Sequence, residues 1–187
     1  MDVLNLRHVV QAGWSNGCHD AYAYVRSYGL QNLKAFIGID MSPKGFKDHA
    51  SDWADCGSLA DVAGWYATTL EQRLEQTGGF VEWMLHRKPS AEELSWMTDE
   101  VLKTPLSVVN LTFLDSLFLD FTAEAKLMHE TMPVVNFLRA DGAENAIAWI
   151  KANIPKSTYV VLDNHLMFWT QPKEFHGTFR DFLAKLG

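Results

Sequence analysis

A serine between two glycines is the first feature of the sequence that could do chemistry. The serine is Ser15, in the run Gly13-Trp14-Ser15-Asn16-Gly17. This GxSxG spacing is typical of a sharp strand-to-helix turn that exposes a nucleophilic hydroxyl, and a side chain in place of either glycine would be expected to collide with the neighbouring strand and helix. Because Gly and Ser are common residues, the motif needs support from the elements around it.

The segments on both sides of this turn have the patterns that the motif requires. Residues 8–12 form a short β-branched run, which predicts a buried strand. After the turn, Gly29 is placed to end a helix in a left-handed conformation, and the face of that helix is apolar at positions i, i+3, i+4 and i+7: Cys18, Ala21, Tyr22 and Val25. The apolar run 35–39 predicts a second strand, parallel to the first through a right-handed crossover. The sequence therefore predicts the α/β class.

The middle of the chain changes to helical patterns and then returns to strands. Residues 44–130 read as helices only, and Ser90 with Glu93 predicts a capping box at the start of one of them. Further strands are expected over 134–138 and 158–162, with a helix between them and a last helix from about Pro172. The predicted architecture is a parallel sheet flanked by helices, built from residues 1–43 and 131–187, with an all-helical insertion over 44–130.

Several segments resemble the α/β-hydrolase fold superfamily, in particular its serine hydrolases and esterases. The region around its nucleophile elbow is similar to LRHVVQAGWSNGCHDAYAYVRSYGLQNLKAFIGIDMSPK. The strand that bears its acid, the next helix and the strand leading to its histidine are similar to MPVVNFLRAD, AENAIAWIKANIP and STYVVLDNHLMFWTQPKEFHGTFRDFL. These segments cover roughly half of the chain, and the helical stretch falls where the family inserts its cap.

The resemblance implies a catalytic triad in the order serine, acid, histidine. Ser15 would be the nucleophile, and His165 would be its base because it alone of the 7 histidines follows the last predicted strand and precedes the last helix. Asp141 follows the third predicted strand, where the family carries its carboxylate, and is preferred as the acid. Asp40 ends the second strand and is the alternative, because some members carry the acid there. The backbone N–H of Asn16 would donate to the oxyanion of the tetrahedral intermediate.

Aromatic and sulfur-containing side chains stand next to these residues in sequence. Trp14 precedes the serine, and Met167, Phe168 and Trp169 follow the histidine, so we expect these four to border the substrate pocket. The two cysteines, Cys18 and Cys56, have no metal-binding spacing. Neither a cofactor nor a metal is expected.

Composition and charge narrow the classes of partner and the compartment. A formal net charge of −7 disfavours a nucleic-acid partner. Two cysteines are too few for a disulfide framework, and the sequence has neither a signal peptide nor an apolar run near the roughly 20 residues that a membrane span needs. We therefore expect a cytoplasmic protein without a membrane partner.

The four predicted strands correspond to the last strands of the family's larger sheet. The loop that supplies the family's second oxyanion donor is not among them, and losing one donor costs about 10²–10³ in rate. We expect a cofactor-independent hydrolase of esters or related acyl bonds that has little activity as this truncated chain. The alternative is a non-catalytic hydrolase-fold remnant or interaction module. The strand over 8–12 would become a sheet edge that could pair with another chain and form a homodimer.

Overall fold

The protein contains one four-stranded parallel sheet, as the sequence predicts. The computed structural model describes residues 1–54, 57–71 and 73–187, and within them the side chains of all but residues 2, 65–66 and 68–75, so Cys56 lies outside the described residues. The strands lie side by side in chain order: β1 (Val9–Trp14), β2 (Leu33–Ile39), β3 (Val134–Arg139) and β4 (Thr158–Leu162). All three strand pairs are parallel, which confirms the predicted α/β class.

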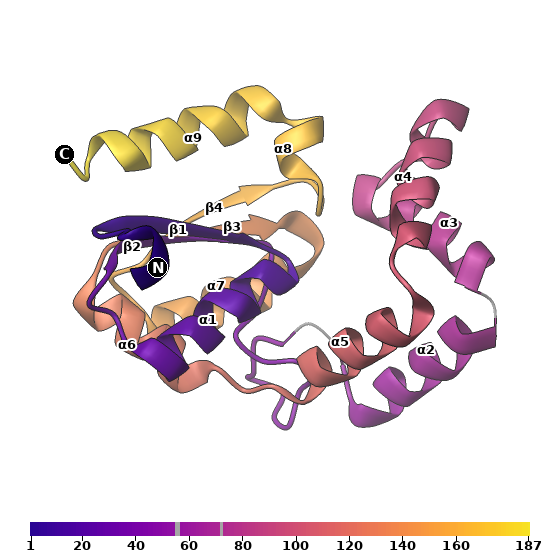
Figure 1. The fold of residues 1–187 in the computed structure, drawn as a ribbon, viewed down its shortest axis with the longest axis horizontal. Helices are drawn as coiled ribbons and strands as arrows, with labels where there is room; N and C mark the ends of the chain where they lie inside the picture. The colour runs from indigo at the N-terminus through magenta and orange to yellow at the C-terminus, as the bar shows by residue number, and fades with distance from the viewer. Residues whose placement is uncertain (55–56, 72) are drawn as a thin grey trace.

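Helices cover both faces of this sheet (Figure 1). One face packs against α1 (Asn16–Tyr28), α6 (Thr122–Thr131) and α7 (Ala143–Asn153), and the other packs against α8 (Met167–Thr170) and α9 (Pro172–Ala184). Successive residues of a strand point to opposite faces. Accordingly, Phe36 joins the core beneath α1, whereas Ile37 joins the core beneath α9. Two short 3-10 helices complete this part of the chain, at Asp2–Leu4 and Ala140–Gly142.

The helix after the serine has the predicted buried face. The side chains of α1 that pack on the sheet include Cys18, Ala21, Tyr22 and Val25, all of which are buried. Gly29 ends the helix at φ 73°, and its N–H donates to Val25 O at 2.8 Å. Since a positive φ is cheap only for glycine, the C-terminal boundary follows from the residue type. Both predictions are confirmed.

A separate group of helices lies beside the sheet, between β2 and β3 in the chain (Figure 1). It consists of α2 (Leu59–Glu71), α3 (Arg73–Leu85), α4 (Ala91–Lys103) and α5 (Leu106–Phe118). The predicted capping box is confirmed, because Ser90 Oγ accepts from Glu93 N while Glu93 Oε2 accepts from Ser90 N. The next helix, α6, packs instead on α1, with Ala125 and Met128 in the sheet core. The helices away from the sheet are therefore α2 to α5, which we call the helical segment.

Within the described residues no single helix has the length and apolar character needed to cross a membrane, although α4 and α5, bent by 88° at the break between them, would pass that test as a pair.

β1 forms one edge of the sheet: it pairs with β2 along one side, and its other side is the edge. An edge strand offers backbone N–H and C=O groups for pairing. The self-association expected from this edge stays a prediction.

Candidate active site

Ser15 stands at a strained turn between β1 and α1. Its backbone has φ 52° and ψ −132°, a conformation that non-glycine residues rarely adopt. The turn is held on both sides, because Ser15 N–H donates to Ile39 O at 3.0 Å and Ser15 O accepts from Cys18 N–H at 2.8 Å. The strand, strained turn and helix are the arrangement that the GxSxG spacing predicts.

The two glycines of the motif differ in what they allow. A Cβ at Gly13 would lie 2.5 Å from Gly17 O and 2.6 Å from Cys18 N, so only glycine permits the close approach of α1 to β1. A Cβ at Gly17 would meet nothing within 4 Å, so the prediction of a collision at that position is wrong. The buried Cys18 fills the contact on the helix side, and its Sγ donates to Gly13 O at 3.0 Å.

His165 lies on the loop between β4 and α8 and contacts Asp40. The distance from His165 Nδ1 to Asp40 Oδ2 is 2.6 Å, and the histidine side chain is buried. Since an ionised carboxylate can only accept, this contact places the imidazole proton on Nδ1. Nε2 of the neutral ring is then free to accept a proton, as a general base must.

Of the two carboxylates proposed for the acid, Asp40 contacts His165 and Asp141 contacts other residues. Asp40 directly follows β2 at φ 47°, and its side chain, 12% exposed, reaches His165. Asp141 belongs to the 3-10 helix after β3 and is 47% exposed; it accepts from Arg139 Nε and lies 3.6 Å from His86 Nε2. The turn after β3 carries Asp141 outward, whereas the left-handed backbone at Asp40 directs its carboxylate toward the histidine. The preferred acid is therefore not the carboxylate that touches His165.

Two indole rings flank the imidazole of His165. Trp14 lies 5.0 Å from it between ring centroids, and Trp14 Nε1–H donates to His165 O at 2.9 Å. Trp83, from α3, lies 5.1 Å away on the same measure. The position of Trp14 next to the serine in sequence predicts this contact. The position of Trp83 does not, because an aromatic residue on a helix of the insertion is more often a core residue than part of a site.

The residues after the histidine divide between core and surface. Met167 is 0% exposed and packs with Phe137 and Phe175 beneath α9, so it cannot border an open pocket as expected. The rings of Phe168 and Trp14 pack nearly perpendicular to each other, with 5.3 Å between their centroids, which places Phe168 next to the site. Trp169 is exposed and stacks on Trp96 of α4 at 5.2 Å.

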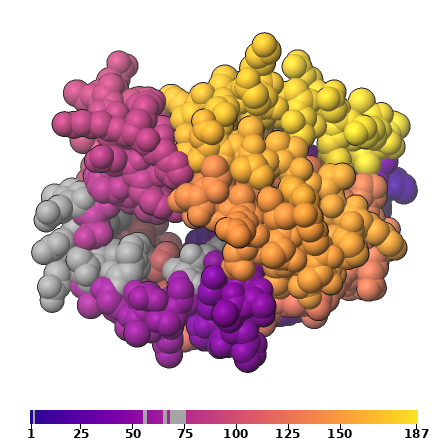
Figure 2. Space-filling model, turned by 180° about the vertical axis from the view of Figure 1, so that it is seen from behind, coloured from indigo at the N-terminus to yellow at the C-terminus, as the bar shows by residue number. Residues whose placement is uncertain are grey.

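The end of α3 is hydrogen-bonded to the histidine loop. Leu166 N–H donates to Met84 O, and Asn164 Nδ2 donates to Leu85 O, both at 3.2 Å. The last carbonyls of a helix have no partner inside the helix, so the loop satisfies groups that would otherwise need water. Figure 2 shows this junction from behind, with the pink surface of α3 and α4 against the orange and yellow surface of the last part of the chain.

In the part of the chain that the structure describes, no hydrogen bond joins the Ser15 hydroxyl to His165, a contact that is often long in enzymes without substrate. The same residues contain no cluster of three or more His, Cys, Asp or Glu side chains that could hold a metal ion.

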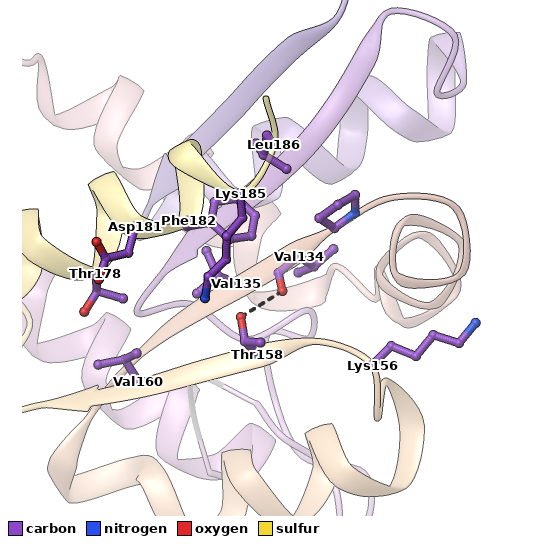
Figure 3. Close-up of a pocket in the computed structure, with 11 residues that line it drawn as sticks. Val134, Val135, Lys156, Thr158, Val160, Thr178, Asp181, Phe182, Lys185 and Leu186 are labelled. Carbon is purple, nitrogen blue, oxygen red and sulfur yellow. Dashed lines mark hydrogen bonds between the residues drawn. The ribbon is translucent and has the colours of Figure 1, made fainter.

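A hollow of about 380 Å³ lies elsewhere, between the amino ends of β3 and β4 and the end of α9 (Figure 3). Its lining includes Val134, Thr158, Phe182 and Lys185. Ser15, Asp40 and His165 all follow the carboxyl ends of their strands. The hollow is therefore at the opposite end of the sheet from the candidate site.

Comparison with known proteins identifies the fold. No protein-family model matches the chain, and no curated protein sequence is similar to it. Bromoperoxidase from Bacillus anthracis superimposes with a TM-score of 0.82 at 17% identity, over 98% of this chain and 70% of that one. An esterase from Exiguobacterium antarcticum superimposes with a TM-score of 0.82 at 16% identity, over 98% of this chain and 69% of the esterase. A putative aryl esterase from Burkholderia cenocepacia superimposes with a TM-score of 0.72 at 19% identity, over 96% of this chain and 65% of that protein. The match extends over nearly all of this chain, which therefore has the α/β-hydrolase fold.

Proposed function

We propose that the protein is a serine hydrolase that cleaves an ester or a related acyl bond, with Ser15, His165 and Asp40 as its triad. The observation that carries the proposal is the 2.6 Å contact of His165 Nδ1 with Asp40 Oδ2. The strained backbone at Ser15, which also follows the carboxyl end of a strand, supports its role as the nucleophile. An esterase and a putative aryl esterase among the proteins of similar fold support acyl-transfer chemistry.

Each group has a defined part in the reaction. His165 Nε2 removes the proton of the Ser15 hydroxyl as Oγ attacks the carbonyl carbon, and the Asp40 carboxylate stabilises the resulting imidazolium. The imidazolium then gives its proton to the leaving alcohol, and an acyl-serine remains. Water, deprotonated by the same histidine, releases the acid and restores the serine.

The oxyanion of the tetrahedral intermediate needs hydrogen-bond donors. Asn16 is the first residue of α1, and the first N–H groups of a helix have no partner within it. These groups also lie at the positive end of the helix dipole. The Asn16 N–H is the first oxyanion donor of the proposal.

Labelling with a fluorophosphonate probe tests this function, because the probe forms a Ser Oγ–P bond with loss of fluoride only at an activated serine. We expect labelling at Ser15, no labelling in Ser15→Ala or His165→Ala, and unchanged labelling in Ser27→Ala, which removes an exposed serine of α1. Asp40→Asn should slow labelling by about 10³–10⁴, since it disturbs the tautomer of the base. Asp141→Asn should slow it by less than about tenfold, because Asp141 does not contact His165.

Absence of labelling in a wild-type protein with a folded circular dichroism spectrum would contradict the proposal. That result would favour a non-catalytic module with a hydrolase fold. Equal loss of labelling in Asp40→Asn and Asp141→Asn would contradict the choice of Asp40 as the acid.

A further inference from the structure

Arg139, the last residue of β3, holds the carboxylate that contacts His165. Its Nη1 lies 3.1 Å from Asp40 Oδ2, and its backbone N–H donates to Asp40 Oδ1 at 3.2 Å. Oδ2 also receives His165 Nδ1. Both oxygens of Asp40 are therefore bonded, and one residue on the neighbouring strand supplies a bond to each.

The Arg139 side chain is itself fixed in place on two further sides. Its Nε donates to Asp141 Oδ1, and its guanidinium carbon lies 4.6 Å from the ring centroid of Trp83. A planar guanidinium can stack on an aromatic ring while its edges bond carboxylates, which an ammonium group cannot do. Trp83 is the same residue whose ring flanks His165, so the helical segment contacts both the base and the cation beside the acid.

Asp141 changes how Arg139 can bind Asp40. A guanidinium that faces one carboxylate tends to make two parallel bonds to it. Such a pairing would compete with His165 for Asp40 Oδ2. Asp141 accepts from Nε, which removes the Nε side of the guanidinium from Asp40. The side chain of Arg139 contacts Asp40 through Nη1, and His165 Nδ1 contacts the same oxygen.

The four charged side chains of this group alternate in sign. When His165 has taken the proton of the serine, the carboxylates of Asp40 and Asp141 lie next to the guanidinium of Arg139 and the imidazolium, while the new negative charge is on the oxyanion of the substrate. Arg139 without Asp141 would cancel the carboxylate that the imidazolium depends on. Asp40 and His165 are largely shielded from solvent, and charges in such places are tolerated when they are paired and hydrogen-bonded.

We propose that Arg139 is a positioning residue that holds the Asp40 carboxylate on His165 Nδ1, and that Asp141 acts on the site only through Arg139. The inference rests on the proposed function for its meaning in catalysis. It goes beyond that function by giving a role to the carboxylate that the triad leaves out.

Proton NMR of protein labelled with ¹⁵N-histidine tests the inference without relying on activity. The His165 Nδ1–H proton, hydrogen-bonded to a carboxylate at 2.6 Å, should give a low-field resonance. Arg139→Gln should remove this resonance or move it to high field, and should slow fluorophosphonate labelling by about 10- to 100-fold through misplacement of the base. Arg139→Lys keeps the positive charge but cannot bond both carboxylates while it stacks on Trp83. It should therefore only partly restore the low-field resonance and the rate of labelling.

Asp141→Asn tests whether Asp141 acts on the site through Arg139. Alone it should shift the Nδ1–H resonance and slow labelling a few-fold, because Arg139 can then turn toward Asp40. In the Arg139→Gln background the same substitution should have no further effect, since residues that act through a shared partner are not additive. Glu144→Gln, which removes another exposed carboxylate three residues along the chain, should leave the resonance and the labelling unchanged.

The outcomes separate the two proposals. A wild-type resonance in Arg139→Gln, or an undiminished effect of Asp141→Asn in its presence, would overturn the role of Arg139. If Arg139→Gln does not fold, Arg139→Lys and Asp141→Asn decide by the same criteria. A resonance that responds as expected in a protein that no probe labels would support the positioning role and contradict the hydrolase function.

Discussion

The layers around the sheet and the helical segment bury their apolar residues to very different extents. Phe137 in β3 is 0% exposed, whereas Leu111 in α5 is 70% exposed. The segment has a small core of its own around Val81 and Met97, and Leu166 of the histidine loop joins that core. Stability therefore comes mainly from the sheet layers, while the helical segment adds side chains to the site from outside.

The candidate site lies at the junction of these two regions. The sheet positions Ser15 and Asp40, which each follow a strand directly and have a positive φ. The helical segment contributes Trp83 and the carbonyl groups at the end of α3. The region that orders the backbone of the site is thus different from the one that covers its histidine.

The largest expected effect contrasts the two regions directly. Phe137→Ala should lower the free energy of unfolding by about 3–5 kcal/mol, because it leaves a cavity beneath α9 next to Phe175. Leu111→Ala should change it by less than about 0.5 kcal/mol, because that side chain is exposed. Urea unfolding followed by circular dichroism measures both values. Similar losses in the two variants would mean that another surface buries α5 in solution.

The second prediction contrasts the two glycines of the elbow. Gly13→Ala should destabilise the protein by about 1–3 kcal/mol, since the added methyl group meets backbone atoms that cannot move independently. Gly17→Ala lies in open space at the start of α1 and should be neutral or stabilising by up to about 1 kcal/mol. Thermal unfolding of the pair measures the difference. A stable Gly13→Ala variant would argue against the close packing of α1 on β1.

These contrasts also show which parts of the molecule could be predicted from sequence. The strands and α1 could be, because apolar runs, helical spacing and Gly29 are local signals. The contact of His165 with Asp40 could not be singled out. Both candidate carboxylates follow strands. Their directions depend on the left-handed backbone of Asp40 and on the 3-10 turn that contains Asp141, and neither has a pattern in the sequence.

The residues that reach the site from other elements were also beyond local patterns. Trp83 belongs to a helix whose place beside the sheet depends on tertiary packing. Met167 lies only two residues after the histidine, yet the turn into α8 directs its side chain into the core. Distance along the chain is therefore a poor guide to which side chains border a site.

The third prediction concerns the junction itself. Asn164 donates from Nδ2 to Leu85 O and accepts at Oδ1 from Thr170 Oγ1 at 3.0 Å. Asn164→Ala should cost about 1–2 kcal/mol, because it removes buried hydrogen bonds. Exchange of the Leu166 amide proton, which is bonded to Met84 O, should become faster.

Asn153→Ala is the matched control, because the side chain of this asparagine donates to Trp149 O within the same helix, α7, and has no other hydrogen bond to the described residues. It should not change exchange at Leu166. Equal exchange rates in the two variants would show that Asn164 does not hold the helical segment on the histidine loop.

The smallest expected effect is a pH dependence that belongs to the sheet layers. Burial lowers the pKa of His19 in α1, against the opposing effect of its contact with Ser42 O at 3.0 Å. Burial also lowers the pKa of His129 in α6, with a further contribution from Lys156. The unfolded chain titrates near the ordinary value of 6.5, so it binds protons at a pH where the folded protein does not. Stability from each histidine is thus complete above about pH 6.5 and decreases below it, by at most about 1.4 kcal/mol per pH unit.

The comparison of His19→Gln with His49→Gln isolates this contribution. Glutamine can still donate to Ser42 O but cannot gain a proton, so His19→Gln should lose less stability than the wild type between pH 7.5 and 5.5, read from urea midpoints. His49 is exposed, and its replacement should leave the wild-type slope unchanged. A slope that responds equally to both substitutions would mean that surface charge, and not burial against the sheet, produces the pH dependence.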